Sequence, residues 1–238
     1  MLATHNNITE LSERFESSSP QDILRWASET YGDKLAVVTS FQITGIVTLH
    51  MLQDIAPQTP VLTLDTGYLF PETLDLMDTL EEQFNLNLTR ITPRQTTSQQ
   101  DRDYGTRLWE RNPDRCCHLR KTIPLRDALE GYEAWVTGLR RDQSSSRSAT
   151  SIISTDKRTG LIKVAPFANW TEDMLWTYIH AYDLPYNKLH DVGYPSIGCW
   201  SCTKSVAEGE DVRGGRWSNH GKTECGIHVE LVQEGANG

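Results

Sequence analysis

Long apolar runs are missing from this chain of 238 residues. Its first residues, MLATHNNITELSERFE, contain no apolar stretch of the length found in a secretory signal. No later segment approaches the roughly 20 apolar residues that a membrane-spanning helix needs. We therefore expect no membrane contact and a cytoplasmic protein, in a compartment where thiols stay reduced.

A surplus of positive charge is also absent, because the formal net charge is −9. A general nucleic-acid binder needs a basic face to neutralise phosphates, so no nucleic-acid partner is expected. A small anionic substrate is still compatible with this charge, since local residues decide its binding. Basic residues recur toward the end of the chain, at Arg140, Arg141, Arg147, Lys204, Arg213, Arg216 and Lys222.

Cysteine is scarce, and its five residues are an odd number, which argues against a disulfide framework. Cys116 and Cys117 are adjacent, and neighbouring Cα atoms, about 3.8 Å apart, are too close for an unstrained bridge. Cys199 and Cys202 form a C-x-x-C turn that can direct both sulfurs at one metal centre. Four thiolates suit either structural zinc or an iron–sulfur cluster, and the adjacent pair on a helix favours the cluster.

The fifth cysteine, Cys225, lies outside this spacing in the segment KTECGIH. It stands between Lys222 and His228, and positive neighbours favour the thiolate form. Cys225 is therefore a candidate nucleophile. A spare exposed cysteine is the alternative interpretation.

Short apolar runs alternate with helical segments along most of the chain, and Ser19 and Thr171 stand at the capping positions of two of these segments. This alternation predicts a mostly parallel twisted sheet with helices on both faces, in the α/β class. We expect a single domain over residues 1–205 and a mobile C-terminal segment over 206–238, which carries the candidate nucleophile. Strands are expected at 34–40, 60–67, 86–92 and 134–138, an edge hairpin at 150–167, and helices at 20–31, 45–55, 71–84, 171–182 and, interrupted near Pro124, over 98–130.

Folds of this class bind ligands at the carboxyl ends of their strands. TSFQITG follows the first strand and enters a helix, so its backbone N–H groups and the Ser40 hydroxyl suit phosphate or sulfate. A plain capped turn is the alternative, and the absence of GKS or GKT excludes a Walker loop. The loop LDTG, residues 64–67, and the loop TGLRRDQSSSR, residues 137–147, should open onto the same edge.

Several motifs occur together and in one order. They are LDTG at 64–67, CC-x-x-RK-x-x-PL at 116–125, TG-x-R-x-x-QS-x-x-R at 137–147, CWSCTK at 199–204, GEDVRGGRW at 209–217 and ECGIH at 224–228. In these motifs the chain resembles the assimilatory adenylyl-sulfate reductases, the iron–sulfur branch of the phosphosulfate (APS/PAPS) reductases. The resemblance covers residues 34 to 228 and implies an adenine nucleotide alpha-hydrolase-like fold of the PP-loop type.

The resemblance implies an activity, a cofactor and partners. The activity is thiol-dependent reduction of adenylyl sulfate to sulfite and AMP in sulfate assimilation, for cysteine biosynthesis. A thiol attacks the sulfate sulfur, AMP leaves, and thioredoxin or glutaredoxin releases sulfite from the S-sulfocysteine that remains. One 4Fe–4S cluster per chain is implied. A homo-oligomer is compatible with the sequence.

The resemblance also implies the roles of individual residues. Cys225 is the nucleophile, Lys121 couples the cluster to the substrate sulfate from one helical turn after Cys117, and His228 contacts the substrate. The expected cluster ligands are Cys116, Cys117, Cys199 and Cys202, and the expected substrate-binding residues are Ser40, Phe41, Leu64, Asp65, Gly67, Arg140, Arg147, Arg213 and Arg216.

Three other functions are alternatives. TSFQIT looks like the first loop of cluster-free relatives, so 3′-phosphoadenylyl sulfate, or both nucleotides, is the closest alternative substrate. An ATP pyrophosphatase of the same fold would need an SGG-x-DS loop, and the glycines of that loop are missing here. A zinc- or cluster-bearing redox sensor with Cys225 as its reactive thiol is the third alternative, and the set of nucleotide loops argues against it.

Overall fold

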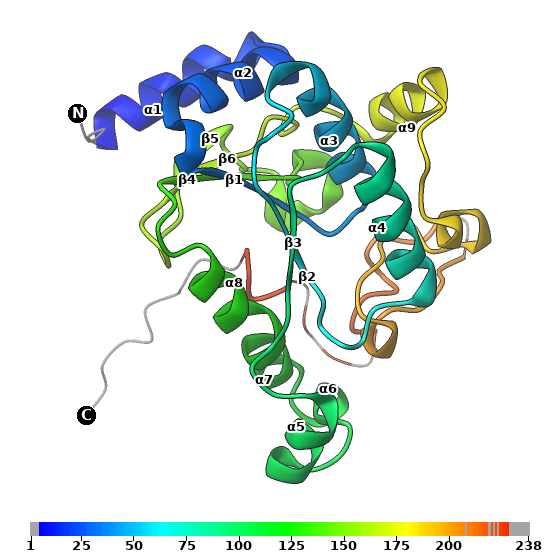
Figure 1. Cartoon of the computed structure of the whole chain (residues 1–238). Coiled ribbons are helices and arrows are strands. Elements are labelled where there is room, and N and C mark those ends of the chain that lie inside the picture. Colours follow the sequence, from blue (N-terminus) through cyan, green and yellow to red (C-terminus); the bar gives the residue numbers. More distant parts are fainter. Residues whose placement is uncertain (1–4, 208, 219, 221, 223, 229–238) are drawn as a thin grey trace.

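The computed structural model describes residues 5–207, 209–218, 220, 222 and 224–228. A six-stranded sheet lies at its centre, with helices on both faces (Figure 1). The strand order is β3-β2-β1-β4-β6-β5, and only β5 and β6 pair antiparallel. The predicted mostly parallel sheet and edge hairpin are therefore confirmed. The strands are β1 (Leu35–Thr39), β2 (Val61–Leu64), β3 (Leu88–Ile91), β4 (Ala134–Thr137), β5 (Ile153–Thr155) and β6 (Ile162–Val164).

The helices occupy the predicted places between the strands. Two of the predicted caps are present, since the side chains of Ser19 and Thr171 accept hydrogen bonds from N–H groups in the first turns of α2 and α9. The described α-helices are α1 (His5–Arg14), α2 (Pro20–Tyr31), α3 (Ile43–Ile55), α4 (Pro71–Gln83), α5 (Thr97–Tyr104), α6 (Leu108–Arg111), α7 (Pro113–Cys117), α8 (Ile123–Ala128) and α9 (Glu172–Ala181).

Apolar cores cover both faces of the sheet, because successive residues of a strand point to opposite faces. In β1, Leu35 and Val37 belong to the larger core, which also includes residues of α2, α3, α4 and α9. Ala36 belongs to the smaller core with Trp135 and with Leu125 of α8. A strand buried on both sides explains why KLAVVTS is an unbroken apolar run rather than an alternating one.

The helical region predicted at 98–130 is broken into several short pieces. A π-helical segment, His118–Thr122, separates α7 from α8. Pro124, two residues after this segment ends, has no N–H to donate to the carbonyl of Arg120, so the α-helical ladder cannot run through it. The predicted interruption near Pro124 is thus present as a π-helical turn, a feature that is frequent at functional sites.

The carboxyl ends of three strands meet at one edge of the sheet. The pairs Thr39↔Thr63 and Val38↔Thr137 place the carboxyl ends of β1, β2 and β4 side by side. The three loops that follow these strands therefore open onto the same edge, as predicted. Among the helices of the described residues, none is both long enough and apolar enough to cross a bilayer.

The described part of the C-terminal segment packs against the domain. Arg216 forms a β-bridge with Thr203, and Ile227 packs against the smaller core. The predicted division into a domain at 1–205 and a mobile segment at 206–238 remains a prediction. Residues 229–238 lie outside the described residues.

Candidate active site

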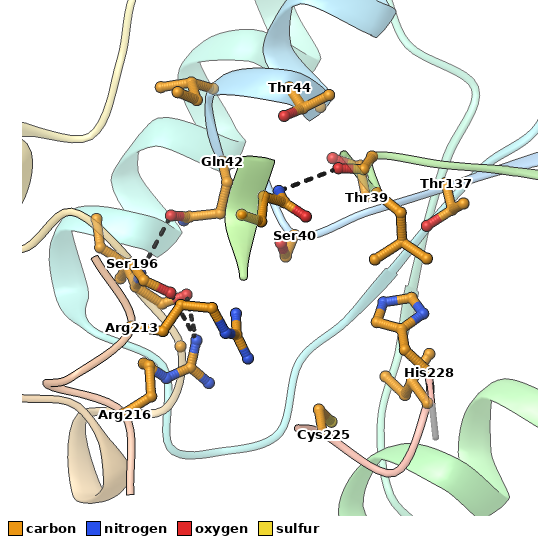
Figure 2. A pocket seen from close by; sticks show the side chains of 18 of the residues that line it. Thr39, Ser40, Gln42, Thr44, Thr137, Ser196, Arg213, Arg216, Cys225 and His228 are labelled. Atoms are coloured by element: carbon orange, nitrogen blue, oxygen red, sulfur yellow. Dashed lines mark hydrogen bonds between the residues drawn. The ribbon is translucent and has the colours of Figure 1, made fainter. Parts of the chain in front are cut away.

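A cavity of about 230 Å³ opens at the carboxyl edge of the sheet (Figure 2). The three strand-end loops, the π-helical segment and the C-terminal segment all contribute to its wall. Phe41, Asp65 and Gly67 are the predicted substrate-binding residues that do not line it. The predicted residues that do are Ser40, Leu64, Lys121, Cys199, Arg140, Arg147, Arg213, Arg216, Cys225 and His228.

The first loop turns sharply before α3. Phe41 has a φ of 54° and a fully buried side chain in the larger core, and its N–H donates to Thr39 Oγ1 at 3.0 Å. A Cβ at Gly45 would lie 2.2 Å from Thr39 Oγ1, so only glycine fits there. The first residues of α3, including Thr44, line the cavity, and N–H groups in a first turn have no intrahelical acceptor. This loop can therefore bind an anion through its backbone, while the Phe41 side chain anchors the turn.

The second loop is shaped by the two predicted residues that lie outside the cavity. Asp65 Oδ1 accepts a hydrogen bond from the Gly67 N–H at 2.9 Å. Gly67 has a φ of 70°, and a Cβ there would lie 3.1 Å from Arg120 Nη2. This turn leaves Leu64 and Thr66 at the cavity wall. Asp65 and Gly67 thus act on the shape of the loop in this structure.

Arg120 is a buried cation to which the sequence analysis assigned no role. Its guanidinium donates from Nε to the carbonyl of Thr66 and from Nη1 to Gln100 Oε1 at 3.1 Å. It also lies 5.0 Å from the centroid of the Tyr68 ring. Arg120 therefore ties the second loop to the helical segment that carries the cysteine pair. Its position in CC-x-x-RK, directly before Lys121, was the signal that could have identified it.

Cys116, Cys117, Cys199 and Cys202 line one small cavity of about 10 Å³. Cys199 Sγ lies 3.3 Å from Thr66 Oγ1, so the second loop also supports the C-x-x-C turn. Burial, followed by the sulfurs of Cys199 and Cys202, raises the pKa of Cys116 to about 11. The four cysteines predicted as ligands are thus brought together, although they come from two distant parts of the chain.

No metal-ion geometry is present at this cavity or elsewhere in the part of the chain that the structure describes. Among the described residues, no group of three or more histidine, cysteine, aspartate or glutamate side chains has the preformed arrangement of a metal-ion site. The donor set at the small cavity is nevertheless four thiols, which is the ligand chemistry of an iron–sulfur cluster or of structural zinc.

Lys121 lines both the small cysteine cavity and the large cavity. Burial by itself would lower the pKa of its ammonium group, but the sulfurs of Cys199, Cys225 and Cys117 raise that pKa above its ordinary value. Lys121 therefore keeps its positive charge at the boundary between the two cavities. This is the place that its predicted coupling role requires.

Cys225 projects into the large cavity from the C-terminal segment, across from the first loop (Figure 2). The neighbouring Cys117 sulfur, and then Lys121 and Arg216, hold the pKa of Cys225 well below its ordinary value despite burial. Lys222 and His228 were the expected sources of positive charge beside Cys225. The structure instead places Lys121 and Arg216 there, because the chain folds the π-helical segment against the tail.

The expected cationic neighbours of Cys225 are engaged differently. Lys222 pairs with Asp114 of α7. Burial, and then the surrounding cations Lys163 and Arg147, hold the pKa of His228 well below its ordinary value, so its imidazole is neutral. The His228 ring lies stacked near Trp135, with ring centroids 6.2 Å apart. His228 thus lines the cavity as a neutral polar side chain.

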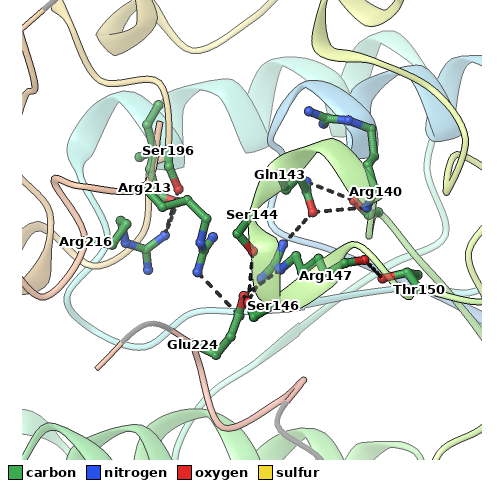
Figure 3. A network of polar contacts seen from close by, with 12 residues as sticks. Arg140, Gln143, Ser144, Ser146, Arg147, Thr150, Ser196, Arg213, Arg216 and Glu224 are labelled. Carbon is green, nitrogen blue, oxygen red and sulfur yellow. Dashed lines mark hydrogen bonds and ion pairs between the residues drawn. The ribbon is translucent and has the colours of Figure 1, made fainter. Parts of the chain in front are cut away.

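The two arginines of the 137–147 loop have different partners. Arg140 is 3% exposed, donates to Asp142 Oδ1 at 2.9 Å and to Thr44 Oγ1 at 2.7 Å, and so ties this loop to the start of α3. Figure 3 shows its guanidinium turned away from the network around Arg147. Arg147 makes two parallel hydrogen bonds, at 2.7 and 2.6 Å, to the carboxylate of Glu224. Both arginines line the cavity, but each is paired with a carboxylate.

The two arginines of GEDVRGGRW stand beside each other at the cavity (Figure 2). Arg213 Nη2 lies 3.4 Å from Glu224 Oε2. Arg216 donates to the Ile197 carbonyl at 3.3 Å and lies over the Trp217 ring, 4.6 Å from its centroid. Neither a carbonyl nor an aromatic ring carries a formal negative charge, so these contacts do not neutralise Arg216. Arg216 and Lys121 are therefore well placed to attract an anion.

Curated relatives match nearly the whole chain. A family model described as the phosphoadenosine phosphosulfate reductase domain matches residues 34–205. The adenosine 5′-phosphosulfate reductase of Halalkalibacterium halodurans is 46% identical over 223 residues, covering 93% of this chain and 96% of that protein. The protein of the same name from Salinibacter ruber is 47% identical over 225 residues, covering 94% of this chain and 89% of that protein.

Solved structures agree with these matches. The phosphoadenylyl-sulfate reductase from Candida auris, in a phosphate complex, has a TM-score of 0.77 and 31% identity, covering 87% of this chain and 99% of that chain. The FMN adenylyltransferase of Candida glabrata has a TM-score of 0.60 at 13% identity, covering 97% and 79% of the two chains, and is similar in fold alone. These neighbours confirm the adenine nucleotide alpha-hydrolase-like fold, and the chain belongs to the phosphoadenosine phosphosulfate reductase family.

Proposed function

We propose that this chain reduces adenylyl sulfate to sulfite and AMP, with Cys225 as the nucleophile. The observation that carries the proposal is the position of Cys225 in one cavity with Lys121 and Arg216, opposite the anion-binding turn before α3. A thiolate must approach a sulfur surrounded by anionic oxygens, so cations have to offset the charge of the phosphosulfate. Similarity to proteins named adenosine 5′-phosphosulfate reductase supports the substrate.

The reaction proceeds in two transfers. In the first, the thiolate of Cys225 attacks the sulfate sulfur, an S–S bond forms, and the bond between sulfur and the phosphate oxygen breaks. AMP leaves with that electron pair, and Cys225 carries a sulfo group. In the second, a thiol of a thioredoxin- or glutaredoxin-type partner attacks Cys225 Sγ, and sulfite leaves with the electron pair of the S–S bond. A second thiol of that partner then reduces the mixed disulfide and returns the Cys225 thiol.

Each group at the cavity has a proposed part in this reaction. The backbone turn at Ser40 and Phe41 and the loop at Leu64, Asp65 and Gly67 form the nucleotide side. Arg216 and Lys121 face the sulfate, and neutral His228 supplies a hydrogen-bonding group that does not compete with them for the anion. Arg140, Arg147 and Arg213 complete the proposed substrate-binding set, with Arg140 holding its loop against α3.

We also propose one 4Fe–4S cluster per chain, held by Cys116, Cys117, Cys199 and Cys202. Four thiols that line one cavity form a donor set that fits this group. When bound, it would join α7 to the C-x-x-C turn and set the charge beside Lys121, while the partner's thiols supply both electrons. We propose a cytoplasmic location, in keeping with cysteines that must stay reduced.

Iron and acid-labile sulfide are expected in equal amounts in protein purified without oxygen, and replacing Cys117 with serine is expected to remove most of both. The physical reason is that three thiolates hold a four-iron cluster less well than four. The measurement is metal and sulfide analysis with the visible absorption spectrum. A colourless wild-type protein that contains zinc instead would contradict the cluster.

Turnover is expected to be faster with adenylyl sulfate than with its 3′-phosphorylated form, with thioredoxin as reductant. Reduction of the 3′-phosphorylated nucleotide is the second candidate function, and the similarity to the Candida auris phosphoadenylyl-sulfate reductase is the observation that favours it. The kcat/KM values for the two nucleotides, measured on the same preparation, decide between them. A larger value for the 3′-phosphorylated nucleotide would reverse the assignment.

A further inference from the structure

The five residues ECGIH dock onto the domain through contacts on both sides of Cys225. On one side, the Glu224 carboxylate binds Arg147 at 2.6 Å and Arg213 at 3.4 Å, and it accepts from Ser146 Oγ at 3.2 Å (Figure 3). The Glu224 side chain is only 12% exposed. Burial would raise the pKa of this carboxyl, but the paired arginines lower it, so it is ionised.

On the other side, the contact comes from the edge hairpin. Arg158 lies in the turn between β5 and β6 and donates from Nη1 to the carbonyl of Gly226. Asp156 holds Arg158 in place, because its carboxylate accepts from the Arg158 backbone N–H at 2.9 Å and lies 3.5 Å from its Nε. Arg158 does not line the large cavity, so substrate contact does not account for it.

We propose that Glu224 and Arg158 form a two-point clamp that positions Cys225 for attack. Glu224 and Gly226 are the immediate chain neighbours of Cys225, so fixing both leaves the cysteine between them little freedom. The backbone N–H of His228 donates to the Cys225 carbonyl at 3.0 Å, which closes the turn that the clamp holds. Glu224 and Arg158 do not touch the reacting atoms, and both are therefore positioning residues.

The ion pairs of Glu224 also affect the charge at the cavity wall, which a purely structural ion pair would not do. A carboxylate between Arg147 and Arg213 offsets two of the cations at the cavity wall and leaves Lys121 and Arg216 facing the Cys225 thiol. If the tail undocked, Arg147 and Arg213 would lose the carboxylate of Glu224 and remain as partly buried cations. This cost favours the docked tail. The clamp thus couples the position of Cys225 to the net charge of the cavity wall.

The test compares Glu224→Gln and Arg158→Ala with two controls, Glu210→Gln in the same tail and Arg94→Ala on the exposed surface. The first readout is the rate of the first turnover, followed as sulfo-adduct formation at saturating adenylyl sulfate with no reductant. Misplacement of a reacting group by about 1 Å costs roughly 10²-fold, so both clamp variants should slow this step about 10- to 100-fold. Both controls should keep the wild-type rate and the wild-type iron content.

The second readout is amide hydrogen exchange, which does not depend on activity. Both clamp variants should raise exchange at residues 224–228 and leave the strands of the sheet unchanged. Wild-type adduct rates, or unchanged exchange at 224–228, in both clamp variants would overturn the clamp. Tighter substrate binding by Glu224→Gln at an unchanged rate would overturn it too, because Glu224 would then be a competitor of the substrate. The clamp rests on Cys225 as nucleophile, and failure of that assignment would show separately, as adduct in Cys225→Ser.

Discussion

Serine in place of Cys225 is expected to abolish the sulfo-adduct and to lower turnover by on the order of 10⁴-fold or more, the scale on which enzymes lose activity without their nucleophile. A serine hydroxyl in this cavity is not ionised at neutral pH, whereas the environment of Cys225 lowers the pKa of its thiol. The adduct is measured by intact-protein mass spectrometry after mixing with adenylyl sulfate and no reductant.

Two comparisons make the Cys225→Ser result specific. Ser218→Ala, in an exposed part of the same segment, should form the adduct like wild type. Iron and sulfide in Cys225→Ser should equal the wild-type values if the other four cysteines hold the cluster. An adduct of one sulfo group in Cys225→Ser, or loss of its iron, would show that the nucleophile is another cysteine or that Cys225 is a ligand.

Alanine in place of Lys121 is expected to lower kcat by about 10²- to 10³-fold, which is the usual cost of removing one pre-positioned electrostatic group. The side chain stands between the small cysteine cavity and the large cavity and keeps its charge next to the Cys225 thiol. Its removal takes away a cation from the sulfate and from the attacking thiolate at the same time. Steady-state kinetics with adenylyl sulfate and thioredoxin measures the loss.

Cluster content distinguishes a chemical role of Lys121 from a structural one. Iron in Lys121→Ala should stay near the wild-type value, because lysine is not one of the four thiol donors. Lys34→Ala, an exposed lysine before β1, is the matched control and should keep both turnover and iron. Wild-type turnover in Lys121→Ala with normal iron would remove Lys121 from the mechanism, and lost iron would assign it to cluster stability instead.

The sheet was predictable because its signals are local. KLAVVTS is apolar without alternation, as a strand buried on both faces requires, and the caps at Ser19 and Thr171 marked two helix starts. The helical region at 98–130 was less predictable in its detail. The π-helical segment before Pro124 packs Arg120 against the second loop, and this contact joins residues far apart in the sequence.

The partners of the charged residues were the least predictable part of the site. Arg140 lines the cavity and also binds Asp142 and Thr44, while Phe41 has its side chain in the core and offers only its backbone to the turn. Glu224 belonged to the ECGIH motif but had no expected role, and Arg158 belonged to no motif. A side chain's partner depends on distances through space, and spacing along the chain predicts those only within one helix or one turn.

The α/β class, the three loops at the strand ends, and the two pairs of cysteines with a fifth outside their spacing can all be read from the amino-acid sequence. Periodicity, caps and motif spacing are local properties, and a linear sequence carries them in full. The positions of Lys121 and Arg216 near the Cys225 thiol, the neutral state of His228, and the docking of Glu224 between Arg147 and Arg213 follow from the folded arrangement. The reason is that burial and Coulomb interactions depend on which distant segments pack together, and they decide the charge on each of these groups.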